Sequence, residues 1–249
     1  MIGFGELRRF ATRWHVDVTD VERAHATSWL LKRIFDDAIL SRALVLRGAS
    51  ALRYAYCADY PMLEPPEFLV TETLDVPAAL GDVLHAESDS DGVKFLIAAR
   101  TRGIVRVDYV GALGRRSAAQ PRILLTFING QTHLPPAHVP LIHPFSDPCA
   151  PMVSAIALEE FIDDQLALLA NPRARDVYDL WFALTRTRDK INLELVRQIA
   201  HPQKDTLFDQ ASRLRLERVW DGALRGVRDH PPFAQVESDL NQALQTFDF

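Results

Sequence analysis

The sequence predicts an α+β protein, in which a mixed β-sheet flanked by helices is followed by a helical C-terminal half. Three observations lead to this prediction. Short apolar runs typical of strands lie before residue 130. Apolar residues at helical spacing dominate from Leu158 onward, and residues 134–151 are rich in proline with little periodicity, which indicates a linker. We therefore expect an αβ domain over residues 1–150 and a helical domain over residues 151–249 that packs across a cleft from it.

The composition is that of a globular protein from a reducing compartment. The chain has 249 residues, of which 48% are hydrophobic and 24% charged, so it can bury a sizeable core. Its net charge of -5 gives no global attraction to nucleic acid. Two cysteines, no apolar leader and no run of membrane-spanning length predict a cytoplasmic protein without a membrane partner.

The first element is expected to be a helix over residues 19–39. Thr19 is followed three residues later by Glu22, which is the spacing of a capping box. Apolar residues then recur at helical spacing, namely Val21, Ala24, Trp29, Leu30, Ile34 and Phe35.

The next elements are a strand, a tight turn and a helix. Residues 43–47 are a short apolar run, Gly48 follows directly, and residues 50–56 have a helical pattern. A turn of this kind suits a phosphate, because a helix N-terminus offers unpaired N–H groups and glycine lets the ligand approach the backbone. A helix start that Ser50 merely caps is the alternative.

Further strands and helices follow in two groups. Strands are expected over residues 68–71, 93–98, 104–110 and 122–128, with a hairpin connection at residues 100–103. The later apolar stripes predict helices near residues 158–169, 177–184, 193–200, 207–227 and 233–247. Arginines near the hairpin are candidates to line a groove for RNA, although a solvated face is the other explanation: Arg100, Arg102, Arg106, Arg115, Arg116 and Arg122. The histidines His133, His138 and His143 share no metal-ligand spacing and are interpreted as loop residues.

Three segments in order resemble motifs of the AbiEii family of nucleotidyltransferase-like toxins, which includes toxins of mycobacterial systems that modify the acceptor end of tRNA. The first segment, residues 44–53, resembles the family's K-G-G-T-A-L turn. Gly48 matches the first glycine, Ala49 stands at the second, and Ser50 matches the threonine. The resemblance implies a nucleotidyltransferase-like fold in which Gly48 and Ser50 hold a nucleoside triphosphate (NTP).

The second segment should carry an Asp-x-Asp pair that holds Mg²⁺ against the triphosphate. Ungapped counting from the glycine turn puts Glu64 on the first Asp and Pro66 on the second. A slip of one residue makes Glu67 the second carboxylate. The resemblance therefore makes Glu64 and Glu67 candidate metal ligands and catalytic residues. Asp108 is a candidate third carboxylate from a neighbouring strand, with an exposed charge on a two-faced sheet as the other explanation.

The third segment resembles the family most closely. Residues 158–170 are similar to L-E-E-I-x-A-E-K-L-x-A-L, and the R-D-x-Y-D-L pattern that follows is present from Arg175. Gln165 replaces the lysine that contacts the triphosphate, and a neutral amide cannot neutralise phosphate charge. The resemblance implies nucleotide-binding roles for Gln165, Arg175, Asp176 and Asp179. An arginine–aspartate pair that only fixes the helix is the alternative for the last three.

These departures from the motif lead to one main hypothesis and two alternatives. The main hypothesis is a member of a bacterial toxin–antitoxin or phage-defence system whose metal motif is degenerate, with weak or no standard NTP transfer. One alternative is an active toxin that adds nucleotides to tRNA with Mg²⁺ held by displaced carboxylates. The other is a non-catalytic subunit of a defence complex. The expected protein partner is an antitoxin or another protein of such a complex.

Overall fold

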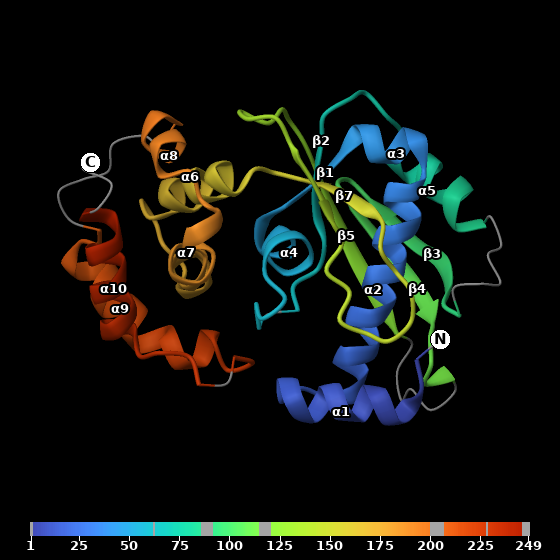
Figure 1. Ribbon diagram of the computed structural model, residues 1–249, viewed down its shortest axis with the longest axis horizontal. Coiled ribbons are helices and arrows are strands. Elements are labelled where there is room, and N and C mark those ends of the chain that lie inside the picture. Colours follow the sequence, from blue (N-terminus) through green and yellow to red (C-terminus); the bar gives the residue numbers. More distant parts are fainter. Residues whose placement is uncertain are drawn as a thin grey trace. The chain divides into compact units, whose positions relative to one another are not determined.

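The computed structural model describes residues 2–61, 63–85, 92–114, 121–199, 207–227 and 229–245 of the chain (Figure 1). The chain divides into two compact units, Met1–Ile156 and Ala157–Phe249. The first unit contains the whole β-sheet, and the second is helical. The fold is the predicted one, a mixed sheet with flanking helices followed by a helical C-terminal part.

The sheet has seven strands in the described residues. They are β1 (Leu44–Arg47), β2 (Glu67–Val70), β3 (Lys94–Thr101), β4 (Ile104–Val110), β5 (Arg122–Asn129), β6 (Ala137–Pro140) and β7 (Met152–Ala155). Their order across the sheet is β3-β4-β5-β2-β1-β7-β6. The pairs β1–β7 and β2–β5 are parallel and the others antiparallel, so the sheet is mixed.

Strands β1 to β5 lie where the sequence predicts them, but the predicted linker over residues 134–151 is wrong. That stretch contains β6, and β7 follows it directly. Each of these two strands has only four residues, and Pro140 and Pro151 lie at their ends. A four-residue strand bounded by proline is too short to establish an alternating pattern, so the sequence gives no periodic signal there.

One face of the sheet is covered by α2 (Val18–Asp36), which packs against β5 and β7 (Figure 1). Aromatic rings join the two layers. The Phe35 and Phe68 rings are 6.3 Å apart, and Phe68 stacks on Phe127 with centroids 5.4 Å apart. This layer is the core of the first unit, and it fixes which side chains of each strand face away from α2.

The start of α2 differs from the prediction. Asp17 caps the helix and its carboxylate accepts a hydrogen bond from Thr19 N at 2.8 Å, so Thr19 does not form the predicted capping box. Glu22 is buried and accepts from Leu113 N instead. Both Asp and Thr are good capping residues, and tertiary contacts decide between them. An amphipathic helix that the sequence analysis missed, α1 (Phe4–Trp14), precedes α2 and buries only Leu7 and Phe10.

The predicted single helix over residues 19–39 is two helices. Asp37 ends α2 and caps α3 (Ala38–Ala43), because its carboxylate accepts from Ile39 N and Leu40 N. A side chain that satisfies the first N–H groups of a new helix favours a break at that point. A further unpredicted helix, α5 (Val76–His85), contacts β3.

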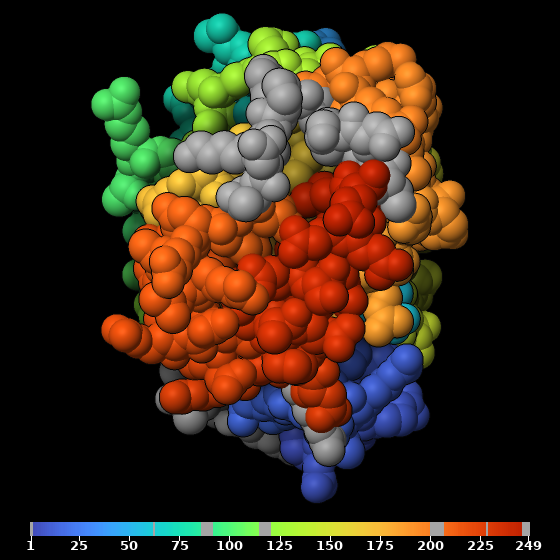
Figure 2. Space-filling view, turned by 90° about the vertical axis from the view of Figure 1, so that its left-hand side faces the viewer, coloured from blue at the N-terminus to red at the C-terminus, as the bar shows by residue number. Residues whose placement is uncertain are grey.

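The second unit consists of helices at the predicted places. They are α6 (Leu158–Leu168), α7 (Ala174–Arg186), α8 (Leu193–Ile199), α9 (Gln210–Ala223) and α10 (Phe233–Gln245), with a short 3-10 turn at Arg188–Lys190. Figure 2 shows the outer surface that α9 and α10 give this unit. Trp220 is buried between these helices, and its indole N–H donates to Pro231 O at 2.9 Å. The apolar stripes that predicted the helices form their shared core.

Candidate active site

The glycine turn after β1 has the predicted arrangement. Gly48 follows Arg47 directly and opens α4 (Gly48–Ala51), which continues as a π-helical turn over Leu52–Tyr56. Gly48 has a φ of +61°, a left-handed conformation that glycine adopts without steric cost. The strand, glycine and helix are therefore in the order that the phosphate-turn prediction requires.

The Ser50 side chain forms hydrogen bonds within the turn. Its side chain is 2% exposed, and its hydroxyl donates to Arg47 O at 2.7 Å. The same hydroxyl accepts from Glu67 N at 3.2 Å. Ser50 thus ties the end of β1 to the start of β2, and it does not cap the helix, because the N-cap residue of α4 is Arg47 and Ser50 lies inside the helix.

Glu67 lies beside the glycine turn. It is paired with Arg47 across β1 and β2, and Arg47 Nε is 3.1 Å from Glu67 Oε1. A Cβ atom added to Gly48 would lie 3.8 Å from that carboxylate oxygen. The acid that the slipped alignment selects is therefore at the turn, with a guanidinium next to it.

Glu64 lines a different feature, a pocket of about 260 Å³ in the first unit. Its other walls include Arg23 and Thr27 of α2, Tyr54, and Arg122 at the start of β5. Residues of α2, of the segment before β2 and of the start of β5 thus line one small pocket. Glu64 has an electrostatic environment of its own, separate from the Arg47–Glu67 pair.

Asp108 on β4 is buried and lies 3.5 Å from Arg106 Nε. The strand register places Asp108 far from Glu67 along the sheet. Glu67 pairs with Thr126, and Thr126 pairs with Ile104, which is four residues from Asp108 along β4. Four residues of an antiparallel strand span roughly 13 Å. Asp108 and Glu67 share a sheet face but are too far apart to ligate one ion.

The arginines proposed for an RNA groove are divided between the two sheet faces. Arg106 and Arg122 lie on the face of Asp108, whereas Arg100 pairs with the buried Val105 and its guanidinium lies near Gly81 of α5. Arg115 and Arg116 lie outside the described residues. Among the described arginines, one continuous strip through Arg100 and Arg106 does not form.

In the second unit, Gln165 of α6 is 6% exposed, and its Oε1 accepts no hydrogen bond from the described residues. Asp176 caps α7: its carboxylate accepts from Arg173 N, Nε and Nη2 at 3.2, 2.8 and 2.6 Å. Arg173 was not singled out from the sequence, because arginine is an unusual residue at a helix N-cap. Asp179 is buried and Arg175 exposed.

A group of side chains that the sequence analysis missed lies elsewhere in the first unit. His25 Nε2 is 2.8 Å from Asp147 Oδ2, and His143 Nε2 is 3.0 Å from Asp147 Oδ1. The Trp29 indole N–H donates to Asp147 Oδ2 at 3.1 Å. His143 is on a loop as predicted, but its side chain is buried against this group. More than 110 positions separate His25 from its partners, so no sequence spacing indicates the group.

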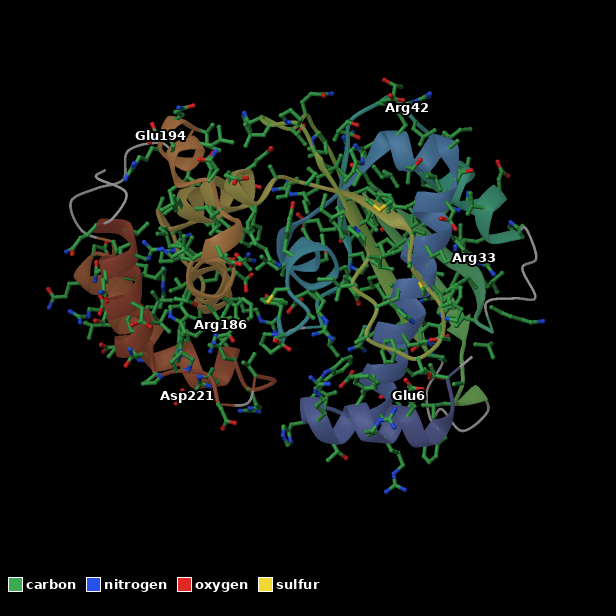
Figure 3. The ribbon with its side chains drawn as sticks, viewed as in Figure 1. Glu6, Arg33, Arg42, Arg186, Glu194 and Asp221 are labelled. Carbon is green, nitrogen blue, oxygen red and sulfur yellow. The ribbon has the colours of Figure 1, made fainter. Side chains whose placement is uncertain are left out.

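Hydrogen bonds set the charge state of this group. Burial opposes ionisation of Asp147, but the hydrogen bonds from His25, His143 and Trp29 outweigh it and hold the pKa of Asp147 below its usual value. Burial is the main cause that lowers the pKa of His25. The loop is also fixed from α1, where Glu6 accepts from Ser146 N and Oγ at 2.9 and 2.6 Å (Figure 3).

The fold is nucleotidyltransferase-like. MenT4, a nucleotidyltransferase toxin from Mycobacterium tuberculosis, is similar with a TM-score of 0.73 and 15% identity over 100% of this chain and 90% of that one. JHP933 from Helicobacter pylori has a TM-score of 0.55 and 13% identity over 92% and 91%. A putative nucleotidyltransferase from the same organism has a TM-score of 0.50 and 15% identity over 93% and 96%.

The family model described as "Nucleotidyl transferase AbiEii toxin, Type IV TA system" matches residues 70–246. The chain belongs to the AbiEii family, as the three segments predicted. The match begins after the glycine turn and after Glu67, so it includes the helical segment from Leu158 onward but not the candidate metal ligands Glu64 and Glu67. No curated protein matches this sequence. None of the helices in the described ranges has the length and hydropathy that a membrane crossing requires.

Proposed function

We propose that this chain is a member of a toxin–antitoxin or phage-defence system in which standard metal-dependent transfer from an NTP is weak or absent. One observation carries the proposal. The three candidate carboxylates do not converge: Glu67 lies at the glycine turn, beside Arg47. Glu64 and Asp108 lie in other environments, near Arg122 and Arg106 respectively.

The reason is the charge that phosphoryl transfer requires. Mg²⁺ is held at about 2.0–2.1 Å by carboxylate oxygens that converge on it. Of the described residues, one group of three acidic, histidine or cysteine side chains has ligand atoms within 4.8 Å of one another, and it contains neither Glu64 nor Glu67 nor Asp108. Without convergent carboxylates, the described part of the protein has no site that holds Mg²⁺ and the triphosphate together.

Gln165 supports the same proposal from the second unit. The amide can donate a hydrogen bond through Nε2, but it adds no positive charge where the family has a lysine. We assign the nucleotidyltransferase-like unit to Met1–Ile156 and treat Gln165, Arg175, Asp176 and Asp179 as the helical unit's contribution to any nucleotide contact. The family description names a type IV system, so the partner we propose is a cognate antitoxin.

The active alternative has one observation in its favour. Glu67 is close to Gly48, and its pair with Arg47 is partly exposed on both sides. An exposed pair of this kind is worth about 0–1 kcal/mol. A triphosphate that attracts Arg47 would release Glu67 to hold Mg²⁺, with tRNA as the acceptor that the family resemblance implies.

The test is transfer of label from each of the four NTPs to total tRNA, with Mg²⁺ or Mn²⁺. We expect trace incorporation or none, and no change in Glu67→Ala or Glu64→Ala. Glu72→Ala is the matched control, because Glu72 also pairs with an arginine, Arg42 (labelled in Figure 3), but follows the end of the β1–β2 pair that is opposite to the turn. Metal-dependent transfer that Glu67→Ala abolishes and Glu72→Ala leaves intact would establish the active alternative.

A further inference from the structure

Three side chains with metal-binding atoms meet inside the first unit, away from the glycine turn. His25 comes from α2, and His143 and Asp147 come from the loop between β6 and β7. One ligand atom from each lies within 4.8 Å of the others. Nucleotide transfer, as argued above, uses none of these residues.

The geometry is compatible with a zinc ion. Zn²⁺ takes histidine nitrogen and carboxylate oxygen at about 2.0–2.2 Å, so tetrahedral ligand atoms lie about 3.3–3.5 Å apart. His25 and His143 contact different oxygens of Asp147, at 2.8 and 3.0 Å, and one ligand atom from each of the three residues lies within 4.8 Å of the other two. Small side-chain rotations are therefore enough to place an ion among the three atoms.

The three side chains form a buried polar group. All three side chains are at most 5% exposed. The Nδ1 atoms of His25 and His143 have no hydrogen-bond partner among the described residues. The pKa of Asp147 is held below its usual value, so the group contains a buried negative charge. A divalent cation would neutralise that charge and bind the two imidazoles in their neutral form.

The surroundings hold the ligands in position. Trp29 donates to Asp147 Oδ2, which supplies the outer hydrogen bond that ligating carboxylates usually have, while Oδ1 lies 3.0 Å from His143 Nε2. The loop is stiffened by Pro144 and Pro148 and fixed at Ser146 by Glu6. We propose that His25, His143 and Asp147 bind one Zn²⁺ ion, which fastens the β6–β7 loop to α2.

The test uses the full chain, stripped of metal by a chelator and titrated with Zn²⁺ and with Co²⁺. We expect one equivalent of Zn²⁺ that survives Glu67→Ala, because that variant alters only the glycine turn. Co²⁺ in the same site should give visible d–d bands that Zn²⁺ displaces. At a hundredfold excess over Kd, Zn²⁺ should raise Tm by roughly 5–10 °C.

His143→Gln is the informative variant, since glutamine keeps a donor near Asp147 but is a poor zinc ligand. Its affinity for Zn²⁺ should fall more than about 100-fold. His138→Gln is the matched control, because His138 is an exposed histidine on β6 in the same unit. The proposal is overturned if the wild-type chain shows no Co²⁺ bands, or binds Zn²⁺ no better than His143→Gln. The group would then be a hydrogen-bonded latch without a metal.

Discussion

Two carboxylates of the first unit, Glu67 and Asp147, are held in opposite ways. The Glu67 side chain is 37% exposed and pairs with one guanidinium. The Asp147 side chain is 5% exposed and accepts from two imidazoles and an indole. Water competes with Arg47 for the Glu67 carboxylate, so this ion pair can be replaced by other partners. Water does not reach the Asp147 carboxylate, so the buried group is part of the core.

The largest effect expected from this comparison is that of Asp147→Ala in metal-free protein. The change removes the common acceptor of His25, His143 and Trp29, and each buried polar group left without a partner costs about 1–3 kcal/mol. We expect a loss of roughly 3 kcal/mol in the free energy of unfolding, measured with urea. Asp221→Ala, at an exposed position of α9, is the control and should change it by less than about 0.5 kcal/mol. Equal effects of Asp147→Ala and Asp221→Ala would contradict the assignment of Asp147 to the core of the first unit.

Ser50→Ala should have the next largest effect. The hydroxyl bridges Arg47 O and Glu67 N inside the protein, so its loss leaves a partly buried N–H unpaired. We expect a loss of about 1–2 kcal/mol in the free energy of unfolding without any nucleotide present. A variant of unchanged stability that binds an NTP more weakly in calorimetry would instead assign Ser50 to the ligand.

The Arg47–Glu67 pair should contribute less than Ser50. A double-mutant cycle with Arg47→Ala and Glu67→Ala should give a coupling energy of about 0–1 kcal/mol, which 1 M salt removes. A coupling above roughly 2 kcal/mol would mean that the pair is a fixed structural contact. The active alternative would then lose its support, because a triphosphate could not release Glu67 easily.

Glu22 gives the smallest expected effect and extends the comparison to a third carboxylate. Burial raises the pKa of Glu22, although the N–H of Leu113 acts in the opposite direction. A raised pKa means that its stabilising contribution is complete below the unfolded value of about 4.5 and is lost as pH rises through the folded pKa. Glu22→Gln should therefore reduce the decline in stability above that pH. An unchanged urea midpoint profile between pH 4 and 7 would contradict this assignment.

The sequence predicted the features that depend on residues close together along the chain. The strand before Gly48 and the helix after it follow from a local pattern, and so do α6 and α7. The position of Glu67 depends on the register between β1 and β2, which an alignment with a one-residue slip leaves open. The group around Asp147 depends on tertiary packing between α2 and a loop more than 110 positions away, which no local pattern encodes.

The position of β7 next to β1 determines when the sheet can be finished during synthesis. β1 is central, and its second neighbour is formed by residues that follow it by about a hundred positions, with Leu46 opposite Ala155 and Leu46 O accepting from Ile156 N at 2.9 Å. At about 5–20 residues per second, a ribosome needs roughly 5–20 s to add that length. Until then the strand that leads into the glycine turn has one unpaired edge. The sheet around β1 is therefore completed only after residue 156 has been synthesised.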